Sequence, residues 1–530
     1  MIRHHVRVHP SAANLPREEQ LAWKIAEVGV SAMELDADVL EMIACRVVDN
    51  AGVALAAINR HPVATARAMA LAHPRPGGAT LFGLPASTRV HAEWAAWANA
   101  TAVRELDFHD TFLAADYAHP GDSIQPILAV AQQTGRGGAD LARAIAVAYE
   151  IHVALVKAIS LHQFKKDHVA HLAPATTAGI GALLGLPVDT IFQAVNLAVH
   201  LAFSTRQSRK GEISSWKAYV PGFSGKLAIE AVDRAMRGEA APSPIYEGED
   251  SVIAWMLGGP ATEYTVALPA PGEPPRGILE TYTKAHSAEY QAQALIDLAI
   301  EMAPKVPDFS EVVEIVVETS HHTHNVIGTG SNDPQKFDPE ASRETLDHSI
   351  MYILAVALED QRWHHEHSYA PERAARTSTV ALWKKIRTIE DPVWTARYHQ
   401  PDPAERAFGG RIKIRMQDGS VLAGEKAAAD AHPNGARPWS WGDYVQKFDR
   451  LTADMLPAGD GEAFLAAAKR VGQLSPSELD ALVPELPDGY VVPDRANGEG
   501  IFDFGVVPQP RGEGAWETEL KTLRERGVGQ

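Results

Sequence analysis

The chain has 530 residues, of which 45% are hydrophobic and 7% aromatic, and its formal net charge is −18 at pH 7. This length exceeds a single ordinary hydrophobic core, so two or more domains are expected. The negative charge argues against nucleic-acid binding, which needs a basic surface, but an anionic substrate is compatible with it if cationic side chains converge locally.

The single cysteine, Cys45, limits the chemistry that the chain can perform. It cannot form an internal disulfide, and an iron–sulfur cluster normally takes three or four thiolates from the protein. An aconitase-type cluster is therefore excluded, and no cofactor is predicted. The sequence shows no glycine-rich phosphate loop, no signal peptide and no membrane span, so we expect a cytoplasmic protein that binds neither nucleic acid nor membranes.

The first half of the chain has a helical pattern almost throughout, rich in alanine and leucine with few strand-like stretches. A proline- and glycine-rich stretch at 269–275 then predicts a domain boundary. Helices are expected before this boundary at 22–30, 38–58, 91–105, 139–159, 170–184, 189–201 and 225–236.

The pattern beyond the boundary mixes strands with helices. Residues 312–319 are β-branched and predict a strand, and 411–422 predict a hairpin around the turn Asp418-Gly419. We therefore expect a smaller α+β domain, after which the helical pattern resumes and rejoins the first domain. The tail after Tyr490 is rich in glycine and proline and predicts an extended strap or partial disorder. Helices are expected at 291–301, 344–358, 379–386, 441–451 and 462–471.

Residues 105–123 form a polar stretch at the end of the predicted helix 91–105. The stretch holds four aspartates and two histidines, and His119 is followed by Pro120 and Gly121, which break the helix. A turn that ends a helix beside apolar segments is suited to acid and base groups. An aspartate-rich solvated loop is the alternative, and the pattern alone leaves both open.

Two histidine clusters, at 320–324 and 363–367, suggest metal sites at first sight. Neither has the His-Glu-x-x-His spacing or a cysteine partner, so solvated loops explain them as well. Whether these histidines have any function stays open: His321, His322, His324, His364, His365 and His367.

A third polar group, Asp167, His168 and His171, begins an uncharged apolar helix, where an unpaired imidazole would be costly. A hydrogen-bonded core histidine is the usual explanation for such a residue. The cations Arg206 and Lys217 follow in the same helical half, and a surface charge run is the alternative reading of these two.

Several of these motifs, taken together and in order, resemble the MmgE/PrpD family. The resemblance rests on Asp107, Asp110 and Thr111 followed by His119-Pro120-x-Asp122, on Asp167-His168-Val, on Lys217 shortly before Gly222, and on Asp347-His348-Ser-x-x-Tyr352. It extends over most of residues 20 to 455. One block departs from the family pattern, because Lys284-Ala-His286 replaces its usual Phe-Pro-Ala segment.

The resemblance implies a mainly α fold, in which a large all-helical domain carries a smaller inserted α+β lid domain. The implied boundaries are 1–275 for the helical domain, 276–430 for the lid, and 431–530 for the return to the helical domain and the C-terminal tail. It also implies a homodimer, with the active site in the cleft between the two domains.

The activity implied by the resemblance is dehydration of the tricarboxylate 2-methylcitrate to 2-methyl-cis-aconitate, without an iron–sulfur cluster or another cofactor. This elimination needs a base, an acid and cationic groups that bind carboxylates. Matching positions suggest catalytic roles for Asp107, His119, His168, Lys217 and Tyr352 and substrate-binding roles for Thr111, Arg206 and His286. Which histidine is the acid and which the base stays open, as do substrate stereochemistry and side activity on citrate.

Two alternatives remain at this stage. The first is a decarboxylase acting on cis-aconitate, or another polycarboxylate lyase or isomerase of the same fold. The second belongs to another class, a non-catalytic metal-binding protein built around the histidine clusters.

Overall fold

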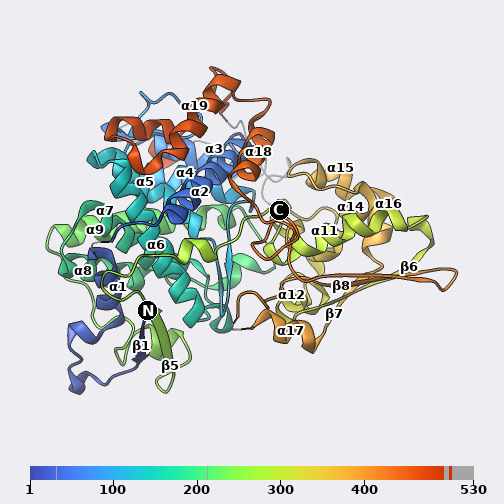
Figure 1. Ribbon diagram of the computed structural model, residues 1–530, viewed down its shortest axis with the longest axis horizontal. Coiled ribbons are helices and arrows are strands. Elements are labelled where there is room, and N and C mark those ends of the chain that lie inside the picture. The colour runs from blue at the N-terminus through green and yellow to red at the C-terminus, as the bar shows by residue number, and fades with distance from the viewer. Residues whose placement is uncertain (32, 212, 401, 494–499, 504–530) are drawn as a thin grey trace, which may run out of the picture.

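The computed structural model describes residues 1–31, 33–211, 213–400, 402–493 and 500–503. In Figure 1 a large group of helices lies beside a smaller part that contains a four-stranded sheet. The two parts have separate hydrophobic cores, here called the first core and the second core. Helices predominate and the strands form small sheets, so the prediction of a mainly α fold is confirmed.

The first core is built from helices whose lengths follow the apolar periodicity of the sequence. The predicted helices are found close to their expected bounds, apart from the start of α9, and three more, α3, α5 and α10, were not predicted. The helices are α1 (Leu21–Val30), α2 (Ala37–Ala56), α3 (His61–Leu71), α4 (Ala92–Glu105), α5 (Ile124–Thr134), α6 (Gly138–Ala158), α7 (Val169–Leu184), α8 (Val188–Ala202), α9 (Trp216–Met236) and α10 (Val252–Met256).

Helix α7 is buried along almost its whole length and contacts α6, α8 and α9, which explains its uncharged sequence. Helix α9 begins at Trp216 and not at the predicted residue 225. The helix therefore contains Pro221 and Gly222, which lie before its predicted start. Gly222 has a packing role, since a Cβ there would lie 2.6 Å from the carbonyl oxygen of Trp97 in α4. Gly222 is thus the point of close approach between two helices.

The strands of the first part are short, and none of them was predicted. Strand β1 (Ile2–Arg7) pairs antiparallel with β5 (Glu263–Leu268), and β3 (Phe112–Leu113) pairs with β4 (Tyr117–Ala118). Strand β2 comprises Pro74–Ala79.

The second core lies between a sheet and several helices. The sheet order is β7-β6-β8-β9, with β6 and β7 parallel and the other pairs antiparallel. The predicted strand at 312–319 and the hairpin around Gly419, which has φ +86°, are confirmed. The elements are β6 (Val312–Thr319), β7 (Ile386–Glu390), β8 (Gly410–Met416), β9 (Val421–Lys426), α11 (Gln293–Met302), α12 (His321–Val326), α13 (Arg343–Leu346), α14 (Ile350–Asp360), α15 (Pro371–Ala374), α16 (Thr377–Trp383) and α17 (Pro392–Tyr398).

The helix predicted at 344–358 is in fact two helices, separated by Asp347, His348 and Ser349. Ser349 caps α14, since its side chain accepts a hydrogen bond from the backbone N–H of Tyr352. The prediction joined the two helices because Ser349 stands directly before the apolar run of α14, and the sequence alone did not reveal that it begins a new helix. The helix predicted at 379–386 likewise ends at Trp383, and β7 follows it.

The chain then returns to the first core through α18 (Trp441–Thr452) and α19 (Ala458–Lys469), both of which contact α2. Buried residues of this return segment belong to the first core, as the sequence suggested. Most of the tail after Tyr490 lies outside the described residues, so the strap prediction is not addressed. None of the described helices combines the length and the apolar composition of a bilayer span.

Candidate active site

Asp107 lies at the end of α4, where the chain leaves the helix in a left-handed conformation with φ +49°. Aspartate tolerates this conformation better than most residues, although it still costs free energy. The side chain is 1% exposed, so its carboxylate needs partners inside the protein.

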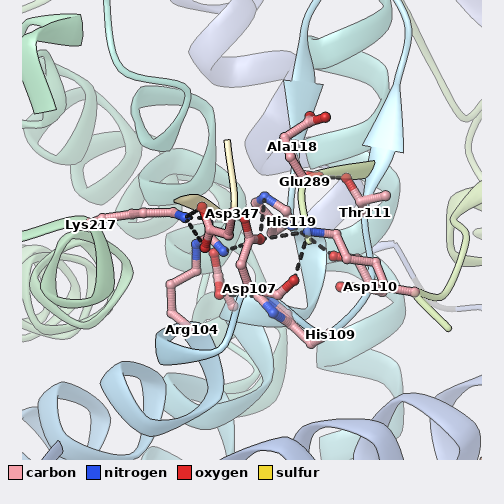
Figure 2. Close-up of polar contacts among 12 residues, drawn as sticks. Arg104, Asp107, His109, Asp110, Thr111, Ala118, His119, Lys217, Glu289 and Asp347 are labelled. Carbon is pink, nitrogen blue, oxygen red and sulfur yellow. Dashed lines mark hydrogen bonds and ion pairs between the residues drawn. The ribbon is translucent and has the colours of Figure 1, made fainter. Parts of the chain in front are cut away.

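Four cationic or imidazole groups surround this carboxylate (Figure 2). Arg104 Nη1 donates to it from the last turn of α4, and Lys284 Nζ lies 2.6 Å from Oδ1. Lys217 Nζ is 3.3 Å from Oδ2, and His119 Nε2 is 3.8 Å from Oδ1. Burial alone would raise the pKa of Asp107, but the charges of Arg104, Lys284 and Lys217 hold that pKa well below its usual range.

The second core contributes Asp347 to the same cluster. Lys217 Nζ, on α9, donates to both oxygens of Asp347 at 2.8 and 2.7 Å. His348 Nδ1 contacts Asp347 and lies 3.3 Å from Lys217 Nζ. The gap between α13 and α14 therefore delivers a carboxylate and an imidazole to a lysine of the first core, as Figure 2 shows for Lys217 and Asp347.

Asp107, Asp347 and His348 together present three ligand atoms within 4.8 Å of one another, as a metal site would. Lys217 already neutralises both carboxylates, however, and Lys284 donates to Asp107 as well. A built-in ammonium thus supplies the positive charge that a divalent cation would supply.

His119 has a defined tautomer. Its Nδ1 lies 2.8 Å from the carbonyl oxygen of Asp110, which can only accept, so Nδ1 carries the hydrogen. Burial, then the charges of Arg104 and Lys284, hold the pKa of His119 well below its usual value. The imidazole is therefore neutral, and its Nε2 atom is the ring nitrogen that faces Asp107.

His168 immediately precedes α7. Its Nδ1 lies 3.0 Å from Asp167 Oδ1, and Arg209 Nε donates to the other carboxylate oxygen at 3.2 Å. The Nε2 atom of His168 is buried and has no hydrogen-bond partner among the described residues. Its ring centre is 5.4 Å from that of His119. Each of the two imidazoles thus has a polar partner at Nδ1, and their rings lie close together. Their Nε2 atoms make no strong contact with the described residues.

Thr111 and Arg206 lie around this pair. The Thr111 hydroxyl donates to the carbonyl oxygen of Ala118 at 2.9 Å and so fixes the β3–β4 hairpin that precedes His119. Arg206 Nε donates to the Tyr117 hydroxyl at 3.0 Å, and the Tyr117 ring is 5.2 Å from that of His168.

Two residues suggested by the resemblance are not brought to the cluster. Tyr352 is 0% exposed in the second core, its hydroxyl donates to the Ser368 carbonyl, and its ring packs 4.9 Å from that of Trp383. It is buried because α14 is enclosed within that core. His286 instead contacts Asp297, 2.7 Å from its Nε2.

The histidine clusters are also separate from the Asp107 cluster. His322 stacks 5.2 Å from the ring of Tyr398, and the rings of His364 and His367 lie 4.2 Å apart. Within the described residues, no metal-ligating group was found that contains any of these histidines.

Several site residues were given no role by the sequence analysis. Arg104 was not singled out, although it lies three residues before Asp107 at a helix end. Lys284, Asp347 and His348 were named only as parts of family motifs, and no local pattern indicated their contacts, since their partners are far away in the chain. Lys447 in α18 was not singled out either, although it donates to the carbonyl oxygens of Phe108 at 2.5 Å and Lys284 at 3.0 Å.

Comparisons with known proteins identify the family of the chain. Residues 19–265 match the model of the MmgE/PrpD N-terminal domain, and residues 286–473 match that of the C-terminal domain. The chain is 27% identical over 410 residues to a 2-methylcitrate dehydratase of Cupriavidus necator, covering 74% of this chain and 80% of that protein. It is 25% identical over 387 residues to a mitochondrial 2-methylcitrate dehydratase of Yarrowia lipolytica, covering 70% and 72%. With both domain models matched in order, the chain belongs to the MmgE/PrpD family.

Proposed function

We propose that the protein dehydrates 2-methylcitrate to 2-methyl-cis-aconitate, the reaction that gives its relatives from Cupriavidus necator and Yarrowia lipolytica their names. The observation that carries the proposal is the pair His119 and His168, two convergent imidazoles beside a group of buried cations. In a chain with net charge −18, this concentration of positive charge favours an anionic substrate.

The elimination breaks a C–H bond beside a carboxylate and the C–O bond of the neighbouring carbon, and a C=C bond forms between them. We assign the base to His168, because Asp167 stabilises the imidazolium that forms when Nε2 accepts the proton. His119 is a weaker base, since Arg104 and Lys284 repel a positive charge on its ring. A bound tricarboxylate would offset that repulsion, so that His119 Nε2 takes up a proton from solvent when the substrate binds. The resulting imidazolium gives this proton to the departing hydroxide, which leaves as water, and the proton held by His168 then returns to solvent.

Lys217, Lys284 and Arg206 would bind substrate carboxylates in this scheme. Lys217 and Lys284 both form ion pairs with Asp107. A substrate carboxylate would therefore either compete with Asp107 for these lysines or join the same network of ion pairs. Thr111 would act indirectly, through the hairpin that positions His119. Removal of the Thr111 hydroxyl should therefore change kcat more than KM.

The two separate hydrophobic cores support a lid mechanism. We propose that residues 276–430, which contain the second core, close over the helical residues 1–275 and 431–530, with the Lys217–Asp347 pair marking the contact. We also propose a homodimer located in the cytoplasm, by analogy with the family. Analytical ultracentrifugation of the purified protein tests the dimer.

The proposed activity is tested by incubating purified protein with 2-methylcitrate, citrate and cis-aconitate, with EDTA present throughout. We expect absorbance of an unsaturated tricarboxylate from 2-methylcitrate. Release of carbon dioxide from cis-aconitate instead would establish a decarboxylase. No turnover, combined with stoichiometric zinc in the protein, would favour a metal-binding protein.

A further inference from the structure

Lys447 of α18 is a buried ammonium that the proposed chemistry does not use. The residue is 1% exposed. Its Nζ donates to Asp49 Oδ1 at 2.6 Å and to the carbonyl oxygens of Phe108 at 2.5 Å and Lys284 at 3.0 Å. An ammonium has three N–H groups, so these three acceptors use all of them and fix the place of the side chain.

The amine of Lys447 keeps its proton at neutral pH. Burial lowers its pKa to about 8, and the charges of Lys284 and Arg46 act in the same direction, whereas the Asp49 carboxylate raises it. Asp49, on α2, is itself 2% exposed, so each member of the pair offsets the cost of burying the other. Lys447 is therefore a fixed cation of the core, and it has no N–H group left for a substrate.

The two carbonyl acceptors belong to two segments that build the cluster around Asp107. Phe108 follows Asp107 directly after α4, and Lys284 lies in the segment that leads into the second core. Lys284 Nζ in turn donates to the carbonyl oxygen of Asp107 at 2.9 Å and to its carboxylate at 2.6 Å. The same two segments are thus joined twice, by Lys447 through the backbone of Lys284 and by the Lys284 side chain itself.

This double connection determines where the Lys284 ammonium lies. Its two hydrogen bonds to Asp107 leave one N–H group without an acceptor among the described residues. That N–H group is the one that can bind a substrate carboxylate. Its direction depends on the position of the Lys284 backbone, which Lys447 holds beside Phe108.

We propose that Lys447 is a positioning residue, which holds the Lys284 backbone so that the Lys284 ammonium meets both Asp107 and a carboxylate of the tricarboxylate substrate. The inference rests on the proposed function and adds to it a residue of the return segment. Lys447 lies outside every motif that carried the family resemblance. Such support matters because a displacement of about 1 Å at a binding group can cost about 100-fold in activity.

The test measures binding of tricarballylate, which has three carboxylates and no hydroxyl to eliminate, by isothermal titration calorimetry on the full-length protein. Lys447→Met removes the ammonium and keeps an unbranched side chain. It should raise Kd for tricarballylate by about tenfold or more, as expected for a misplaced charge-assisted hydrogen bond. With 2-methylcitrate it should raise KM more than it lowers kcat, because Lys284 binds the ground state as well as the transition state. Lys469→Met, at an exposed lysine of α19, is the control and should leave Kd unchanged.

The variant Lys284→Met separates a positioning role from a purely structural one. If Lys447 acts through Lys284, adding Lys447→Met to Lys284→Met should change Kd by less than about twofold, because the positioned group is already gone. Urea denaturation should show a loss of stability from Lys447→Met in both backgrounds. An equal rise of Kd in both backgrounds would overturn the proposal. A folded Lys447→Met protein with wild-type Kd would overturn it as well and leave Lys447 a structural residue.

Lys447→Met leaves Asp49 buried without its partner, which can prevent folding. In that case Lys447→Met/Asp49→Asn, which removes both charges of the pair, is compared with Asp49→Asn alone. The same rise in Kd is expected between these two proteins, and an unchanged Kd would refute the positioning role.

The outcome also separates this inference from the proposed function. If the wild-type protein binds tricarballylate but leaves 2-methylcitrate intact, the dehydratase proposal fails, while the variants still decide the role of Lys447. Folded variants with wild-type Kd would refute that role even if dehydration is observed. A wild-type protein that neither binds a tricarboxylate nor dehydrates one would refute both.

Discussion

Lys217 of α9 and Asp347 of the loop between α13 and α14 form a buried ion pair that joins the two cores at the site, with Nζ 2.8 and 2.7 Å from the carboxylate oxygens. The same ammonium lies 3.3 Å from Asp107 Oδ2. Lys217 is therefore both a structural counterion for two carboxylates and a candidate substrate ligand, and the two roles have different consequences.

Lys217→Ala should damage both stability and substrate binding. It leaves two buried carboxylates with one partner fewer, for which a loss of about 3–5 kcal/mol in the free energy of unfolding is typical. It should also raise KM for the tricarboxylate strongly, an effect that weakens as substrate charge falls. Urea denaturation and steady-state kinetics measure the two losses. Lys226→Ala on the same helix, where the lysine lies over the ring of Trp94, should cost about 1 kcal/mol or less and leave KM unchanged.

His168→Gln tests the general base against a matched histidine on α7. The variant should lower kcat by about 100-fold or more and leave the fold nearly intact. His171→Gln should behave in the opposite way, because His171 Nε2 is hydrogen-bonded to the Ile159 carbonyl at 3.0 Å inside the core. Its melting temperature should fall while kcat of the folded enzyme stays near normal. If the two variants have the same kcat, His168 is a core histidine and the base lies elsewhere.

Two tyrosine substitutions compare a site residue suggested by the family resemblance, Tyr352, with a tyrosine that the structure places beside His168, Tyr117. Tyr352→Phe removes one buried hydrogen bond to Ser368, so it should cost about 0.5–1.5 kcal/mol of stability and leave kcat and KM unchanged. Tyr117→Phe removes the acceptor of Arg206 beside His168 and should raise KM. Thermal unfolding and kinetics of both variants measure this contrast. A large loss of kcat in Tyr352→Phe would restore the catalytic role suggested by the sequence.

Only part of the fold and of the candidate site could be predicted from the sequence. Helices such as α6 and α7 were predictable because their apolar periodicity and terminal glycines are local signals. Asp107 and His119 were found because one short segment holds both. The Asp347 contact could not be found in this way, because an ion pair between residues 130 positions apart leaves no pattern in sequence.

The boundary of α9 was missed for a related reason. Pro221 and Gly222 indicate a helix end locally, but the packing of Gly222 against α4 outweighs that local preference. Tyr352 matched a motif of which the first two residues, Asp347 and His348, lie in the cluster around Asp107, whereas Tyr352 itself lies in the second core. Tertiary contacts, not local propensity, decide both cases.

Dehydration should persist in EDTA and in air. The one cysteine cannot hold an oxygen-labile cluster, and ammonium groups already neutralise the carboxylates of the cluster around Asp107. Burial raises the pKa of Cys45 to about 12, so alkylating reagents should leave activity intact as well. Activity is followed in dialysed protein with and without added metals. Loss on chelation that iron or zinc restores would contradict this expectation.

Stability should fall as the pH drops from about 7 to about 5, because several buried histidines are neutral in the folded protein. Burial lowers the pKa of His171 to about 4 and that of His348 to about 3, and it lowers the pKa of His168 as well. Below pH 6.5 the unfolded chain binds protons at these residues and the folded chain does not, so unfolding is favoured.

The depressed pKa values of Asp107 and Asp347 act in a separate window, since their stabilisation is lost only as the pH falls below about 4. Between pH 6.5 and 5 the histidines are opposed by Asp116, Glu247 and Glu289, because burial raises the pKa of each to about 7 and they stabilise the fold as the pH falls. The buried histidines with lowered pKa are more numerous and dominate, each contributing up to about 1.4 kcal/mol per pH unit.

Urea unfolding at pH 7.5, 6.5, 5.5 and 5.0 measures the slope. His171→Gln, which cannot titrate, should reduce the slope by up to that amount, whereas replacing the exposed His5 by Gln should leave it unchanged. An equal slope in the wild type and His171→Gln would show that His171 is protonated in the folded protein.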